Sequence, residues 1–204
     1  KGPYTETDTP DPLNYYCRTK LAGENTILTS KISATILRTN VVYGKLPGVK
    51  TDFVTWVRDS CNNGVTIKAA EDQWGNPTPA VDVALATLRA LERRRRGVFH
   101  IGGADYVNRY TFAQHIASVL KLDASRIESV RTEELLQAAK RPVRAGLVTL
   151  KAETELGVKP TRIDDGLIEY LRVTGPRTRF SVPSSFSTSS NSTDAFLNTS
   201  SEQP

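Results

Sequence analysis

The chain has 204 residues, of which 38% are hydrophobic and 24% charged, and its formal net charge is +5. This length suffices for one domain with a sizeable core, and no run approaches the roughly 18 apolar residues of a membrane span. The basic excess gathers in ERRRRG, residues 92–97, at the end of a helical pattern, where cations complement the helix dipole. Because no aromatic residues interleave with it, a solvated helix end is favoured over a nucleic-acid surface.

The two cysteines, Cys17 and Cys61, lie far apart and lack the spacing of metal ligands. Only His100 and His115 could add nitrogen ligands, so a zinc site is not expected. Free thiols are typical of a reducing compartment, and we expect the protein to be cytoplasmic.

The N-terminal part predicts a loop, a helix and a buried strand. Residues 1–12, KGPYTETDTPDP, form a polar, proline-rich loop. Asp11 and Pro12 then suit a helix start, with the Asp as cap and the Pro in the first turn, and this helix is expected to run to about Ser30. SATILRTNVVYG, which begins at Ser33, is an apolar β-rich run and predicts a buried strand.

The rest of the folded part alternates between helical and strand patterns. TDFVTWVRDSCNNG predicts a helix capped by Thr51 or Asp52, VTIKAA a short strand and EDQWGNPTPA a loop. VDVALATLRALERRRR predicts an amphipathic helix, GVFHIGG predicts a strand that ends in glycines, and TFAQHIASVLKL predicts a helix capped by Thr111. Three more helices are expected in TEELLQAAK, VTLKAETELG and IDDGLIEYLRV. This alternation predicts an α/β fold with parallel strands.

The last part of the chain differs in character. SVPSSFSTSSNSTDAFLNTSSEQP, residues 181–204, has nine serines and no apolar periodicity. Such a segment buries too little apolar surface to order itself. We therefore expect a folded domain over residues 1–173 and a disordered, serine-rich tail over residues 174–204.

A tyrosine and a lysine with helical spacing are the first candidates for chemistry. In NYYCRTKLAGEN, residues 14–25, Tyr16 and Lys20 lie four positions apart and so share one helix face, whereas Tyr15 faces elsewhere. A free phenol has a pKa of about 10, and a nearby cation favours its ionisation. Tyr16 could therefore act as a general acid toward a carbonyl oxygen. The plainer interpretation is an aromatic ring beside a solvated lysine, and the flanking residues must decide.

The flanking residues resemble one enzyme family. GPYTETDTPDPLNYYCRTKLAGEN is similar to the stretch around the catalytic helix of extended short-chain dehydrogenases, in the branch of the dTDP-4-dehydrorhamnose reductases. ILRTNVVYG, DQWGNPT followed by VDVALA, GVFHIGG, and RPVRAGL with KAETELG follow in the order of that branch. The resemblance covers about residues 2–173. It implies the C-terminal part of a Rossmann-like α/β domain with its substrate-binding subdomain.

The resemblance also assigns roles to individual residues. Tyr16 would donate the proton to the substrate carbonyl, and Lys20 would bind the nicotinamide ribose and lower the phenol pKa. Tyr16, Lys20, Arg38 and Thr39 would contact the cofactor. The substrate pocket would be formed by Asn40, Val41, Gln73, Asn76, Thr78 and Arg141. Two plainer interpretations stay open: Gly-Asn-Pro makes a turn in any protein, and Arg141 could cap a helix end.

Several features depart from that family. Cys17 stands where glycine is common, and Val41 stands where rhamnose reductases often carry tryptophan against the sugar. The sequence has no glycine-rich turn of the kind that binds a cofactor pyrophosphate, since Gly102-Gly103 lacks a third glycine. The Ser/Thr partner of the catalytic tyrosine would precede residue 1. We therefore expect a piece of a longer protein whose N-terminal strands are missing here.

The expected function is that of the longer protein. It would reduce a 4-keto group of a nucleotide-linked sugar with NADPH or NADH, while this piece alone would be inactive. An epimerase or dehydratase on the same scaffold is an alternative. Because a relative in this branch is the regulatory subunit of methionine adenosyltransferase, a non-catalytic binding subunit is another. The expected partner is a nucleotide sugar, with a homodimer left open and with neither metal, nucleic acid nor membrane.

Overall fold

The computed structural model describes residues 2–44 and 52–174 of the chain. The predicted serine-rich tail falls outside these ranges except for Thr174, which ends the last helix. No helix in the described part is long and apolar enough to cross a membrane.

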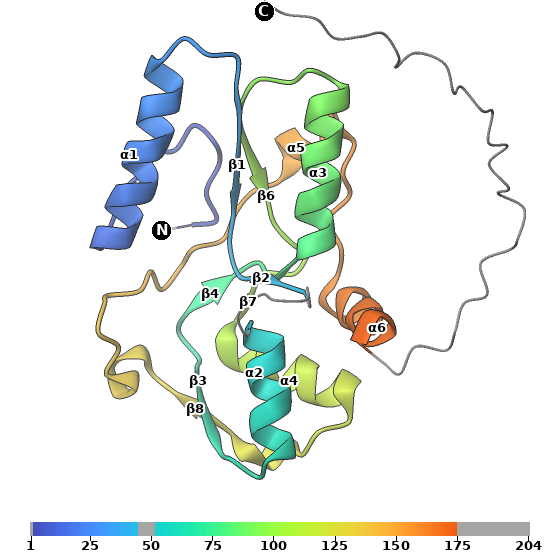
Figure 1. Ribbon diagram of the computed structural model, residues 1–204. Helices are drawn as coiled ribbons and strands as arrows, with labels where there is room; N and C mark the ends of the chain where they lie inside the picture. The colour runs from blue at the N-terminus through green and yellow to red at the C-terminus, as the bar shows by residue number, and fades with distance from the viewer. Residues whose placement is uncertain (1, 45–51, 175–204) are drawn as a thin grey trace, which may run out of the picture.

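One part of the molecule is built on a pair of parallel strands (Figure 1). β1 (Thr35–Thr39) pairs with β6 (Gly97–Ile101), and α3 (Ala80–Glu92) and α5 (Leu150–Leu156) pack against this pair. Because Phe99 and Leu156 are completely buried here, apolar burial holds the pair and its helices together. The parallel α/β arrangement that the sequence predicts is confirmed.

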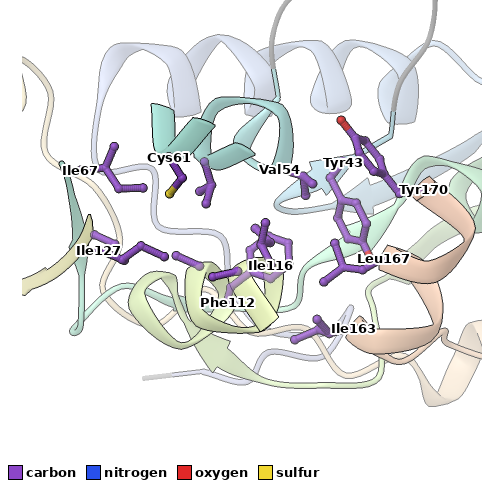
Figure 2. Packing of buried hydrophobic residues seen from close by; sticks show 14 residues of the cluster. Tyr43, Val54, Cys61, Ile67, Phe112, Ile116, Ile127, Ile163, Leu167 and Tyr170 are labelled. Atoms are coloured by element: carbon purple, nitrogen blue, oxygen red, sulfur yellow. The ribbon is translucent and has the colours of Figure 1, made fainter. Parts of the chain in front are cut away.

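A second part holds the larger apolar core (Figure 2). Its helices are α2 (Phe53–Asn62), α4 (Arg109–Leu120) and α6 (Ile163–Thr174), and its strands β3 (Ile67–Ala70) and β8 (Ile127–Val130) pair in parallel. The centre of this core is made by Val54, Phe112, Ile116, Ile163 and Leu167, each at most 1% exposed.

Short strand pairs join the two parts. β2 (Val42–Tyr43) pairs in parallel with β5 (Thr78–Pro79), and β4 (Trp74–Gly75) pairs antiparallel with β7 (Val107–Asn108). Two 3-10 turns, η1 (Ala124–Arg126) and η2 (Thr132–Leu135), flank β8. These pairs bring the chain after β1 next to the loop 73–77 and the start of α4.

The helix starts correct two of the predicted caps. The expected cap of α2 is confirmed at Asp52, which accepts from the backbone N–H of Thr55 at 2.7 Å. The first helix, α1 (Tyr15–Thr29), instead starts after Asn14, which accepts from the N–H of Cys17 at 2.9 Å. Likewise α4 is capped by Asn108, so that Thr111 is the donor of the capping hydrogen bond rather than the cap. At both helix starts an Asn side chain lies three residues before a backbone N–H that has no partner within the helix. Asn is among the residues preferred at this capping position.

Two predicted elements are shorter than expected. The strand from Ser33 is divided into β1 and β2, because Val41 has a positive φ of 48° and turns the chain between them. The helix expected in TEELLQAAK is only η2. Leu136 follows it with a φ of 44° and is 90% exposed, so no apolar surface supports a longer helix.

The helix α1 is attached mainly by polar contacts. None of its residues is buried, and Figure 1 shows it beside β1 without another helix packed over it. Arg38 of β1 forms an ion pair with Glu24, and the Asn14 amide donates to the carbonyl of Lys140 at 2.9 Å. Among the described residues β1 pairs only with β6, so its other edge has no strand beside it there.

Candidate functional site

A pocket of about 440 Å³ lies where α1, the end of β1, the loop 73–77, the start of α4 and the segment 141–145 meet. These segments come from five separate stretches of the sequence. The pocket brings together six of the predicted site residues: Tyr16, Thr39, Asn40, Val41, Gln73 and Arg141.

Tyr16 and Lys20 share the face of α1 that the spacing predicts. The Lys20 Nζ lies 5.4 Å from the centroid of the Tyr16 ring. Tyr16 is 67% exposed and lines the pocket, whereas Lys20 does not belong to the lining. Tyr15 is 82% exposed and stays outside the pocket. The arrangement gives Tyr16 an accessible phenol with a cation beside its ring, as a proton donor to a bound carbonyl would need.

Arg38 is engaged by the helix and does not line the pocket. Its Nε lies 3.0 Å from both carboxylate oxygens of Glu24, and its Nη2 lies 2.6 Å from Oε2. Both side chains are largely shielded, with 24% and 19% exposed. A forked pair of this kind fixes orientation as well as distance. In this structure Arg38 therefore holds α1 against β1, and contact with a cofactor stays a prediction.

The residues after β1 form the pocket floor. Thr39 is exposed at the end of the strand, and the Asn40 amide donates to the carbonyl of Ala145. Val41 turns the backbone with its positive φ, and a side chain at Gly75 would lie 3.2 Å from a Val41 methyl carbon. Glycine at 75 therefore lets the loop approach this turn closely.

The predicted loop residues divide into two groups. Gln73 lines the pocket, and its Nε2 donates to Thr132 Oγ1 at 3.1 Å and to Gln137 Oε1 at 3.2 Å. Asn76 and Thr78 instead point into the interior, with 6% and 0% exposed, and they do not belong to the lining.

Backbone partners occupy the polar atoms of that second group. Asn76 donates to the carbonyl of Gly103 at 3.0 Å and accepts from the N–H of Leu147 at 2.8 Å. Thr78 donates to the carbonyl of Asn76 at 2.8 Å and accepts from the N–H of Gly103 at 3.2 Å. These bonds lock three segments together behind the pocket. The structure thus gives both residues a supporting place in the loop, in contrast to the direct substrate contact expected from the sequence.

Sequence reasoning missed Arg109. It is the first residue of α4, lines the pocket, and has its guanidinium carbon 5.2 Å from the ring centroid of Phe53. Burial and, to a smaller extent, neighbouring Arg141 lower the pKa of Arg109 to about 10, so it is still a cation at neutral pH. A correct cap at Asn108 would have placed Arg109 in the first helical turn rather than in a loop.

The lining combines apolar side chains, such as Trp74 and Phe112, with polar ones, and its charged groups among the described residues are all cationic. It holds the two arginines Arg109 and Arg141 together with Asn, Gln, Thr and Tyr side chains, and no Asp or Glu. Such a surface suits a compound that has carbonyl or hydroxyl groups together with an anionic group. Among residues 2–44 and 52–174 there is no cluster of His, Cys, Asp and Glu that could hold a metal ion.

The family described as the RmlD substrate binding domain matches residues 1–174. The probable low-salt glycan biosynthesis reductase Agl14 of Haloferax volcanii is 35% identical over 169 residues, which are 81% of this chain and 56% of that protein. Methionine adenosyltransferase 2 subunit beta of Rattus norvegicus is 36% identical over 164 residues, which are 76% of this chain and 48% of that protein. The chain thus spans about half the length of these curated relatives.

Solved structures show the same fold. A dTDP-4-dehydrorhamnose reductase of Clostridium acetobutylicum superposes with a TM-score of 0.78 at 29% identity, over 85% of this chain and 60% of that one. The dTDP-4-dehydrorhamnose reductase of Bacillus anthracis, solved in complex with NADP, gives 0.74 at 25% identity, over 82% and 58%.

Proposed function

Because this chain belongs to the RmlD substrate binding domain family, we propose that the protein containing it is an oxidoreductase that reduces the 4-keto group of a nucleotide-linked sugar with NADPH or NADH. The resemblance to the dTDP-4-dehydrorhamnose reductase branch and the mixed α/β fold are confirmed by the family match and the structural neighbours. The activity itself is a proposal for the longer protein, since this chain spans little more than half of its relatives.

The observation that carries the proposal is Tyr16 at the pocket with Lys20 beside its ring. The nicotinamide cofactor, when bound, would supply hydride to the carbonyl carbon. Tyr16 would hold its phenolic proton within reach of the carbonyl oxygen and release it as negative charge develops there. Lys20 would favour the phenolate that remains and would offer its ammonium to the ribose hydroxyls.

The residues present fit the nicotinamide end of such a cofactor. Tyr16 and Thr39 are both exposed, and both face the same pocket, one from the start of α1 and one from the end of β1. Polar groups at the carboxyl end of a parallel strand are the usual location of a ligand in α/β folds. Through its ion pair with Glu24, Arg38 would fix the orientation of α1 relative to β1. This role would add to the direct contact with the cofactor that the resemblance implies.

For the sugar, the substrate side of the pocket would be Asn40, Val41, Gln73 and Arg141. Asn76 and Thr78 would contribute by holding the loop that carries Gln73. Val41 is smaller than the tryptophan frequent at this position in rhamnose reductases, so the pocket would accept a bulkier or differently oriented sugar. The substrate class is therefore a 4-keto nucleotide sugar, with the sugar left open.

A direct assay tests the proposal. The complete protein would be incubated with NADPH and a panel of 4-keto-6-deoxy nucleotide sugars, and the loss of NADPH absorbance would be followed together with product formation. Stoichiometric oxidation of NADPH supports a reductase. Conversion of the sugar without net oxidation would instead support an epimerase or dehydratase, and no turnover of any sugar would contradict both.

A non-catalytic subunit is the second candidate, and the observation in its favour is the 36% identity to methionine adenosyltransferase 2 subunit beta. In that case the protein would bind a methionine adenosyltransferase and change its kinetics. Copurification with that enzyme, together with the absence of NADPH turnover, would favour this function over the reductase.

A further inference from the structure

The Asn14 side chain forms hydrogen bonds to two different parts of the chain. Its Oδ1 accepts from the backbone N–H of Cys17 at 2.9 Å, and its Nδ2 donates to the carbonyl of Lys140 at 2.9 Å. Because one partner is a donor and the other an acceptor, only one orientation of the amide satisfies both. Asn14 thus caps α1 and also joins it to a segment 126 residues further along the chain.

The second of these bonds is not required to cap a helix. Ser and Asp stabilise a helix start about as well as Asn does. Asn differs from both because its short planar amide carries the acceptor and the donor on two separate atoms. The contact with Lys140 therefore points to a role of Asn14 beyond capping.

The contact joins two walls of the pocket. Asn14 and Tyr16 line the pocket from the start of α1. Arg141 and Pro142, the two residues directly after Lys140, line it from the other segment. A ligand in the pocket lies between these walls, so their separation decides how close it comes to the Tyr16 hydroxyl.

The segment that contains Lys140 is fixed on its other side to the pocket loop. The N–H of Trp74 donates to the carbonyl of Val143 at 2.8 Å, and the N–H of Ala145 donates to the carbonyl of Trp74 at 2.9 Å. Residues 140–145 therefore run from α1 to the loop 73–77, and the Asn14 amide forms the connection at the α1 end.

The start of α1 depends on such a connection. None of the residues of α1 is buried, so apolar packing does not fix its first turn. The ion pair of Glu24 with Arg38 lies two helical turns beyond Tyr16, about 12 Å along the axis at 1.5 Å per residue. Asn14 directly precedes the turn to which Tyr16 belongs. Its bond to Lys140 therefore controls the orientation of that turn more directly than the ion pair does.

We infer that Asn14 is a positioning residue for Tyr16. By holding the carbonyl of Lys140, it fixes the separation between the Tyr16 phenol and the wall formed by Arg141 and Pro142. A misplacement of reacting groups by about 1 Å can lower a rate about 10²-fold. This inference rests on the proposed function, to which it adds a residue that acts through Tyr16 and need not touch the substrate.

Two variants separate this role from capping. Asn14→Ser and Asn14→Asp keep an acceptor for the N–H of Cys17 but lose the amide group that reaches Lys140. Asn14→Asp alone also adds a negative charge, so an effect common to both variants is not electrostatic. The matched control is Thr29→Ala near the other end of α1, because the exposed Thr29 donates to the carbonyl of Asn25 within the same helix.

Limited trypsin proteolysis of the complete protein measures the structural connection. Trypsin cleaves the peptide bond after Lys140, and the carbonyl of that bond is the one that Asn14 holds. Cleavage of a folded chain follows the population that opens locally. Loss of one hydrogen bond should raise the cleavage rate at this bond about tenfold in Asn14→Ser and Asn14→Asp. The rate in Thr29→Ala should equal that of the wild type.

Steady-state kinetics with NADPH and 4-keto-6-deoxy nucleotide sugars measures the positioning. The kcat of Asn14→Ser and Asn14→Asp should fall about ten- to hundredfold. The Kd of NADPH should stay close to the wild-type value, because Tyr16 and Lys20 are both unchanged. Thr29→Ala should keep the wild-type kcat. A residue that only caps the helix would leave both the cleavage rate and kcat unchanged in the two Asn14 variants.

Three results would overturn the inference. The first is a wild-type cleavage rate after Lys140 in both Asn14 variants, and the second is faster cleavage with an unchanged kcat. The third is a loss of kcat in Asn14→Asp alone, which would assign the effect to charge. Failure of the proposed reductase is a separate outcome: wild-type protein would oxidise no NADPH, and the cleavage rates would still decide whether Asn14 joins the two walls.

Discussion

The ammonium nitrogen of Lys20 lies 5.4 Å from the ring centroid of Tyr16, one helical turn away along α1. The neighbouring Tyr15 is 82% exposed and lies outside the pocket that Tyr16 lines. Adjacent positions on a helix differ by about 100°, so only one of the two tyrosines can share a face with Lys20. The pair in the sequence therefore contains one candidate for proton transfer and one natural control.

We predict that Tyr16→Phe in the complete protein abolishes reduction and leaves cofactor binding almost intact. The hydroxyl would deliver its proton in the transition state, a contribution of about 10²- to 10⁴-fold, while the ring packs in the same way without it. Steady-state NADPH oxidation and a cofactor titration measure the two effects. Near wild-type turnover of Tyr16→Phe on every 4-keto sugar tried would remove the catalytic assignment.

Two further variants serve as comparisons for Tyr16→Phe. Lys20→Ala should lower both turnover and cofactor affinity, because its ammonium would serve the ribose as well as the phenol. Tyr15→Phe should leave both unchanged. Equal losses of turnover in Tyr15→Phe and Tyr16→Phe would indicate that both substitutions disturb α1. The loss could then be assigned to neither hydroxyl group.

We predict that Arg38 and Glu24 act as one unit. Arg38→Met and Glu24→Gln should each destabilise the attachment of α1 by about 1–2 kcal/mol, and the double variant should lose little more than either alone. Amide hydrogen exchange in α1 should rise in all three, because none of its own residues is buried. If Arg38 contacts the cofactor directly, as the family resemblance implies, Arg38→Met will weaken cofactor binding and Glu24→Gln will not.

The features predictable from the sequence are those set by neighbouring residues. Tyr16 and Lys20 lie four positions apart, so helical geometry alone places them together. The start of α2 is likewise predictable, because Asp52 is a preferred capping residue directly before the helical pattern. Asn76 is a contrasting case. Its two partners, Gly103 and Leu147, lie 27 and 71 residues further along, and no local pattern shows that they meet.

Arg109 was missed as a second cation of the pocket for the same reason, whereas Arg141 was expected there. Arg109 belongs to the start of α4, and Arg141 belongs to a loop 32 positions later; their proximity depends on how α4 packs against the segment 141–145. The local sequence around Arg109 predicts only the beginning of a helix. Whether an arginine finds a carboxylate is a property of the packed structure, and among residues 2–44 and 52–174 neither Arg109 nor Arg141 forms an ion pair with one.

We predict that the protein loses stability as the pH falls from about 7 to 5, in part through His100. Burial lowers the pKa of His100 below its usual value, against the opposing influence of Glu6 and of its Nδ1 contact with the Tyr4 carbonyl at 3.1 Å. The native state then binds fewer protons than the unfolded state near pH 6.5, so the free energy of unfolding decreases as the pH decreases.

The variant His100→Gln isolates this contribution. It should be less stable than wild type at pH 7 but should show a flatter dependence of the denaturation midpoint on pH. Chemical denaturation of the complete protein at several pH values measures the slope. A slope unchanged by the substitution would assign the acid sensitivity to other groups.

We predict that Gly166→Ala destabilises the protein although alanine is the better helix former. A Cβ at Gly166 would overlap with the Tyr43 hydroxyl oxygen and would lie 2.9 Å from Pro79 Cγ. Tyr43 is 2% exposed and cannot move aside easily. Overpacking of about 1–3 kcal/mol should therefore exceed the gain in helix propensity of about 1 kcal/mol. Gly23→Ala in α1 is the matched control, because its Cβ would meet no atom within 4 Å, and it should stabilise the protein.

A second substitution should reverse the effect at Gly166. The Tyr43 hydroxyl is buried and lacks a hydrogen-bond partner among the described residues, so Tyr43→Phe alone should leave stability unchanged or raise it. Phenylalanine also removes the atom closest to the new methyl group. Gly166→Ala combined with Tyr43→Phe should thus be more stable than Gly166→Ala alone, with Pro79 as the remaining close contact. Thermal denaturation of the four proteins gives the coupling energy, and strictly additive effects would show that the hydroxyl is not what excludes a side chain at position 166.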